Sequence, residues 1–151
     1  MGQGQGAGRR RVVAAVALAA LMLVLAACSR MAPEQRLRGQ LSAMQAALEE
    51  RRAGDFMAGV AADFAGNDGI DHAALQQVVR AQVLANARIG LTLGPAQVEM
   101  AGDRATVRFS AMATGGSGRF LPEHAQAWEV TTGWRDEGGH WRLYYAEWTP
   151  R

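Results

Sequence analysis

Apolar residues recur at helical spacing soon after residue 33. The recurring positions are Leu37, Leu41, Met44 and Leu48. Steps of three and four residues place such positions on one stripe of an α-helix, while charged residues take the other sides. The pattern predicts a first amphipathic helix that ends near Ala53.

A second, short helix is predicted directly after the first. Asp55 stands where an N-cap is expected, because its carboxylate can accept hydrogen bonds from the first free N–H groups of a helix. Phe56, Val60 and Phe64 then fall on one face. A loop at 66–69 is expected to separate this helix from the next element.

A third helix is predicted from its N-cap, Asp71, to about Asn86. Leu75 and Val79 form its apolar stripe, and Gln82 and Asn86 lie close to that stripe at about 3.6 residues per turn. Polar groups in such a position either bind a ligand or bond to neighbouring backbone. The sequence leaves both alternatives open.

The period of the pattern changes to two from Leu91 onwards, which predicts a switch from helix to sheet. Gly102-Asp103 is typical of a two-residue hairpin turn. Folding the chain there creates an apolar face with the cross-strand pairs Met100 with Ala105, Val98 with Val107, and Ala96 with Phe109. A slip of one residue would mix polar and apolar positions, so this register is favoured.

A second hairpin is predicted with its turn at 136–139, which pairs Arg135 with His140. In this register one face is rich in aromatic residues, and its pairs are Trp134 with Trp141, Thr132 with Leu143, Val130 with Tyr145, and Trp128 with Glu147. The opposite face carries Tyr144 and Trp148.

The first 27 residues have the pattern of an export signal. Three arginines at 9–11 precede an apolar run of 16 residues at 12–27, which is too short to span a bilayer as a helix. The run ends in Leu25-Ala26-Ala27-Cys28, which resembles the lipobox of bacterial lipoproteins. The alternative is an ordinary signal peptide followed by an incidental cysteine.

The lipobox resemblance implies cleavage before Cys28, acylation of that residue and a membrane anchor. Ser29 follows it, where lipoproteins retained in the inner membrane of Gram-negative cells usually carry aspartate. We therefore expect an outer-membrane lipoprotein on the periplasmic side of the cell envelope. The expected organisation is a signal peptide at 1–27, an anchor and short tether at 28–33, and one domain at 34–151.

Composition narrows the chemistry of this domain. The formal net charge of +2 includes three arginines of the signal segment, so 13 arginines face 14 acidic residues in the rest of the chain. This balance provides no basic surface for nucleic acid. The chain has no lysine, a single cysteine, and histidines only at positions 72, 124 and 140. We therefore expect no cofactor, no metal site and no intrachain disulfide.

The order of the predicted elements gives an α+β fold in which N-terminal helices cover a curved antiparallel sheet. Two segments, 49–55 (EERRAGD) and 134–143 (WRDEGGHWRL), come before the second helix and at the last hairpin. With these segments the chain resembles the nuclear transport factor 2-like superfamily, also called ketosteroid isomerase-like or polyketide cyclase-like. The resemblance implies a cone-shaped domain with a pocket at its mouth. Members include isomerases, dehydratases, cyclases and non-catalytic binding modules.

Residues on the aromatic face of the last hairpin are the candidates for this pocket. With the two polar residues of the third helix, the predicted lining is Trp128, Val130, Trp141, Leu143, Tyr145, Glu147, Gln82 and Asn86. Glu147 is the candidate catalytic acid, because an apolar cavity raises the pKa of a carboxyl group, and Tyr145 could donate to an oxyanion. The alternative for Glu147 is a solvated position at the rim. Asp63 could act with a histidine, or lie on a solvated helix edge.

The leading hypothesis is an envelope-anchored lipoprotein that binds a small apolar ligand or a protein partner without catalysis. One alternative is an isomerase or dehydratase that uses Glu147 with Tyr145. Another is a structural partner in an envelope complex, with its pocket packed solid. A homodimer through the outer sheet face, with Tyr144, Trp148 and Met112, is also predicted.

Overall fold

The computed structural model describes residues 31–117 and 124–151. The predicted signal segment and Cys28 lie outside these residues. The chain divides into two compact units, Met1–Pro33 and Glu34–Arg151. The second unit contains every residue of the hydrophobic core and all of the sheet, so it can be studied as a domain with its own core.

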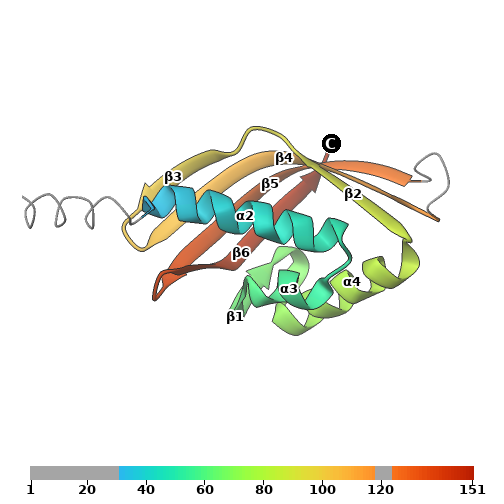
Figure 1. Ribbon diagram of the computed structural model, residues 1–151, viewed down its shortest axis with the longest axis horizontal. Coiled ribbons are helices and arrows are strands. Elements are labelled where there is room, and N and C mark those ends of the chain that lie inside the picture. Colours follow the sequence, from blue (N-terminus) through green and yellow to red (C-terminus); the bar gives the residue numbers. More distant parts are fainter. Residues whose placement is uncertain (1–30, 118–123) are drawn as a thin grey trace, which may run out of the picture. The chain divides into compact units, whose positions relative to one another are not determined.

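The second unit has an α+β fold, which confirms the predicted class. Its helices are α2 (Pro33–Glu49), α3 (Ala53–Ala58) and α4 (His72–Ala85), with a 3₁₀ turn at Asn67–Gly69. Its strands are β1 (Val60–Gly66), β2 (Arg88–Leu93), β3 (Gln97–Ala101), β4 (Arg104–Gly116), β5 (His124–Glu137) and β6 (His140–Pro150). Figure 1 shows α2 lying across a strongly curved sheet, with α3 and α4 near its C-terminal end.

The strands form one sheet in the order β1-β6-β5-β4-β2, and β3 also pairs with β4. Most pairs are antiparallel, as predicted, but β1 runs parallel to β6 and forms an edge of the sheet. The long strand β4 pairs with β3 through its first half and with β2 through its second half. The sheet is therefore mixed, which corrects the prediction of a wholly antiparallel one.

The third helix and the first hairpin are confirmed. The Asp71 carboxylate accepts the N–H of Ala74 at 2.8 Å and caps α4. The hairpin turns at Gly102, whose φ is 65°, and pairs Met100 with Ala105. The same register pairs Val98 with Val107 and Glu99 with Thr106, whereas Ala96 precedes β3 and is not part of the ladder.

The second predicted helix is wrong beyond Ala58. Residues 60–66 form strand β1, in which Val60 pairs with Leu143 of β6. A spacing of four positions fits a strand as well as a helix, because Val60 and Phe64 also lie on one side of an alternating strand, and both are buried. Asp55 lies in the first turn of α3 and forms an ion pair with Arg52, which occupies the N-cap position.

The predicted register of the second hairpin is also wrong. Gly138 and Gly139 both have positive φ and form a two-residue turn, so Glu137 pairs with His140 and Trp134 with Leu143. One extra residue then enters β6, because the next pair is Gly133 with Tyr145. Tyr144 is thus the extra residue of a β-bulge.

This bulge exchanges the two faces of β6 beyond Tyr144. Ala146 and Trp148 now face the core, where Ala146 is 6% exposed. Tyr145 and Glu147 alternate with them and lie on the outer face, contrary to the prediction. Trp148 correspondingly leaves the predicted outer face.

Candidate functional site

An apolar cavity of about 200 Å³ lies between the helices and the inner face of the sheet. We call it the inner cavity. Helices and sheet both contribute aliphatic and aromatic side chains to its wall, among them Leu41, Met44, Leu48, Phe56, Phe64, Phe109, Trp134 and Trp148. A dry apolar cavity of about 150 Å³ can already hold a molecule of the size of benzene. The inner cavity is therefore large enough for a small apolar group.

The polar side chains in the inner cavity, Gln45 and Thr132, already have partners within the protein. The Gln45 amide donates to the carbonyl oxygen of Leu91 at 2.7 Å. The Thr132 hydroxyl donates to the carbonyl oxygen of Val107 at 3.0 Å and accepts the indole N–H of Trp134 at 2.8 Å. Among the described residues, no ionisable side chain lines this cavity, and the Thr132 hydroxyl is occupied by its two hydrogen bonds.

Replacing Thr132 by valine is expected to lower the free energy of unfolding by about 2 kcal/mol, because the buried indole N–H of Trp134 would lose its acceptor. Chemical denaturation of the unit Glu34–Arg151 measures this loss. In the Thr132→Val background, Trp134→Phe should cost less than in the wild type, since a phenyl ring has no donor to satisfy. Equal costs in both backgrounds would contradict the assigned hydrogen bond.

A second hollow of about 540 Å³ lies between α4 and the ends of β2, β4 and β5. We call it the outer cavity. It is more polar than the inner cavity, and the polar residues that line it are Gln82, Asn86, Thr114, His124 and Gln126. Apolar residues such as Val79, Ile89 and Trp128 complete its wall.

The two cavities are neighbours, because Leu48, Leu91 and Trp148 line both of them, and we call these three residues the threshold. The backbone of Trp148 is held by Asn67, whose amide oxygen accepts its N–H at 3.1 Å and whose amide nitrogen donates to its carbonyl at 2.6 Å. Side chains of α2 bind both backbone groups of Leu91. The threshold is therefore fixed in place by hydrogen bonds.

The structure distributes the predicted lining residues over three places. Val130 and Leu143 line the inner cavity. Trp128, Gln82 and Asn86 line the outer cavity.

The third place is away from both cavities. Trp141 is only 2% exposed and belongs to the core, but it lines neither cavity. Tyr145 and Glu147 lie on the outer face, which corrects the prediction that they face the pocket. The Tyr145 hydroxyl donates to the Glu147 carboxylate at 3.1 Å, and this hydrogen bond raises the pKa of Tyr145. Tyr145 is 38% exposed, so the pair is a surface contact.

Trp148 is the main wall residue that the sequence prediction missed. A bulge in β6 brings it inside, and nothing in the alternation of polar and apolar residues marks that bulge. Leu41, Met44 and Leu48 were assigned only to the first amphipathic stripe. A helical stripe must cover something apolar, and here it covers the inner cavity.

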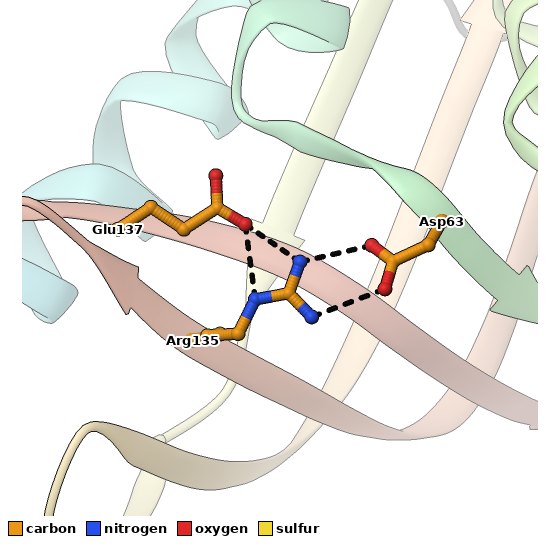
Figure 2. A network of polar contacts seen from close by, with 3 residues as sticks. All are labelled: Asp63, Arg135 and Glu137. Atoms are coloured by element: carbon orange, nitrogen blue, oxygen red, sulfur yellow. Dashed lines mark hydrogen bonds and ion pairs between the residues drawn. The ribbon is translucent and has the colours of Figure 1, made fainter.

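Asp63 takes part in a separate network of charges, shown in Figure 2. Arg135 donates to both carboxylate oxygens of Asp63, at 2.9 and 3.1 Å, and also to Glu137. These hydrogen bonds lower the pKa of Asp63 and raise the pKa of Arg135. The centroid of the Tyr144 ring lies 5.7 Å from the guanidinium carbon of Arg135 and 5.4 Å from that of Arg104. None of these residues lines either cavity.

Residues 31–117 and 124–151 contain neither a candidate metal site nor a membrane-spanning helix. No three or more His, Cys, Asp or Glu side chains in this part of the chain are grouped so that they could hold a metal ion. Within the same residues no helix has the length and apolar character needed to cross a membrane.

The fold is similar to the folds of solved nuclear transport factor 2-like proteins. A nuclear transport factor 2-like protein of unknown function from Pseudomonas putida has a TM-score of 0.65 and 20% identity over 77% of this chain and 84% of that one. A proposed scytalone dehydratase from Novosphingobium aromaticivorans has a TM-score of 0.70 and 11% identity, over 78% and 83%.

Bd1075 from Bdellovibrio bacteriovorus has a TM-score of 0.69 and 13% identity, and the match covers 78% of this chain but only 41% of Bd1075. No family model matches the sequence, and no curated protein matches it. At these identities the likeness concerns the fold, which agrees with the cone-shaped α+β architecture predicted from the sequence.

Proposed function

We propose that the chain is an envelope-anchored lipoprotein whose domain binds a small apolar ligand in the inner cavity without catalysing a reaction on it. The observation that carries the binding proposal is the apolar cavity of about 200 Å³ itself. The lipobox resemblance at Cys28 carries the proposal of a periplasmic membrane anchor.

Transfer of apolar surface out of water supplies the driving force for such a ligand. Burying apolar surface gains about 25 cal/mol for each Å². The polar side chains of the wall need no partner from the ligand, because Gln45 and Thr132 are bonded to backbone carbonyl groups. These two facts favour an apolar group in the inner cavity over a polar one.

The composition of the wall also supports binding without catalysis. Proton transfer requires an acid or base within hydrogen-bond reach of the reacting atom. The isomerase or dehydratase alternative assigned that task to Glu147 with Tyr145, and both lie on the outer face. The proposal therefore assigns no catalytic residue to the inner cavity.

The hypotheses about protein partners fit this structure less well than ligand binding does. A purely structural domain with a solid interior would have no cavity beneath its helices, whereas this domain has one. The predicted homodimer face keeps Met112, which is 44% exposed, and Tyr144, but it loses Trp148 to the inner side. A homodimer stays a prediction.

Filling the inner cavity tests the binding proposal. Ala111 is buried on the inner face of β4, and Ala111→Leu is expected to weaken binding of the neutral dye phenylnaphthylamine at least tenfold, because the added side chain takes up the ligand's volume. Dye fluorescence with the unit Glu34–Arg151 measures the affinity. Ala127→Leu, on β5 and lining neither cavity, is the matched control.

Equal affinities of the two variants would contradict the proposed site, provided that circular dichroism shows both to be folded. Should Ala111→Leu fail to fold, Val130→Phe provides a second filling of the same wall. Absence of dye binding to the wild type would contradict the proposed function itself.

A further inference from the structure

We propose that the outer cavity binds the uncharged polar head of an amphiphile whose hydrocarbon tail occupies the inner cavity. This inference rests on the proposed function. It adds a second binding site and names the chemical class of the ligand, which is a neutral single-chain amphiphile such as a fatty alcohol, a monoacylglycerol or a fatty amide.

The geometry of the threshold supports one continuous ligand. Leu48, Leu91 and Trp148 line both cavities, and the proposal places the chain of the ligand between their side chains. All three side chains are apolar, which suits methylene groups and disfavours a polar group. The head group is thereby directed to the outer cavity.

The outer cavity offers polar groups that can bond to such a head. Gln126 and His124 are exposed on β5, and their side chains form no hydrogen bond with any described residue. The Asn86 amide nitrogen donates to the backbone oxygen of Gln82 at 3.0 Å and to its side-chain oxygen at 3.2 Å. The amide oxygen of Asn86 is left as an acceptor.

Gly115 leaves room for the amide of Asn86 in this polar wall. A Cβ atom on Gly115 would lie closer to the amide oxygen of Asn86 than real contacts allow. The amide of Asn86 therefore lies directly against the backbone of β4. The same feature makes glycine at 115 a requirement of the polar wall.

The charge of the wall determines the class of head group. No Asp, Glu or Arg among the described residues lines the outer cavity. Arg88 precedes the lining residue Ile89, but neighbouring residues of a strand point to opposite faces. His124 is the ionisable residue among the described lining residues, so a carboxylate or ammonium head finds no Asp, Glu or Arg there to replace its water, whereas a hydroxyl or amide exchanges water for Gln and Asn side chains at little cost.

A comparison of two ligands of equal chain length tests this inference. Isothermal titration calorimetry at about pH 8, where decanoate is ionised, measures the affinities of decanol and decanoate for the unit Glu34–Arg151. Wild type is expected to bind decanol at least tenfold more tightly. Gln126→Arg places a guanidinium in the outer cavity and is expected to shift the ratio at least tenfold towards decanoate.

Gln77→Arg is the matched control, because Gln77 is exposed on α4 and lines neither cavity. The substitution changes the net charge by the same amount as Gln126→Arg. It should leave the wild-type ratio unchanged. Equal affinities of wild type for the two ligands, or equal shifts of the affinity ratio in the two variants, would overturn the inference. The proposed function would still be supported in that case if Ala111→Leu weakens the binding of decanol. If wild type binds neither decanol nor decanoate, the inference fails. If it also binds no phenylnaphthylamine, the proposed function fails with it.

Discussion

Replacing Cys28 by serine is expected to abolish incorporation of fatty acid into the protein. Lipidation takes place on a thiol, and Cys28 is the only cysteine of the chain, so a hydroxyl at this position removes the single acceptor. In a Gram-negative host supplied with labelled palmitate, wild type should carry the label and Cys28→Ser should carry none. The variant should also keep its signal segment, because the lipobox implies a cleavage that depends on the modified cysteine.

Ser29→Asp is the matched control for this experiment. It leaves the acceptor thiol intact, so the label should be retained, while the protein should move from the outer-membrane to the inner-membrane fraction. Each buried methylene would contribute about 0.8 kcal/mol, so the acylated protein is expected to stay in a membrane fraction in both cases. A labelled Cys28→Ser variant, or an unlabelled wild type, would contradict the lipoprotein proposal.

Elements controlled by local chemistry could be predicted from the sequence. Asp71 caps α4 through a hydrogen bond to a residue three positions away, and Gly102 supplies the positive φ of the first turn. The alternation on either side of that turn admits one register, because any slip would place polar residues in the core. Pattern and structure agree here because all of the determining contacts are close in sequence.

Elements controlled by distant contacts could not be predicted in this way. The segment at 60–66 becomes strand β1 because it pairs with β6, some 80 residues later in the chain. Phe56, Val60 and Phe64 fit a helix stripe equally well when that partner is unknown. Tertiary pairing decided between two local alternatives that the sequence left nearly equal.

The sequence also predicted only part of the candidate site, namely the residues whose positions follow from the local pattern. Val130 lies on β5, whose own alternation is not changed by the extra residue of β6, and it lines the inner cavity. Gln82 and Asn86 follow from the periodicity of α4 and line the outer cavity. Tyr145 and Glu147 lie beyond the extra residue of β6, so an alternation counted without it assigns them to the wrong face.

The second large expected effect is a loss of stability on replacing Gly133, the glycine that lies opposite the extra residue of β6. Gly133 is buried, and a Cβ atom there would lie 2.9 Å from Cζ of Tyr144 and 3.1 Å from Cβ of Tyr145. Gly133→Val is therefore expected to lower the free energy of unfolding by about 3 kcal/mol, as overpacking of a buried site does. For a domain of this size the melting temperature should fall by about 10 °C, which thermal denaturation of Glu34–Arg151 measures.

Two comparisons assign this loss to the bulge. Thr131→Val, two positions away on the same face of β5, also introduces a valine but meets no such obstacle, so it should change the melting temperature little. Tyr144→Ala removes the nearest obstructing atoms, and in that background Gly133→Val should cost clearly less than in the wild type. If Gly133→Val costs as much without the Tyr144 ring as with it, close packing against the bulge is not the reason for glycine at 133.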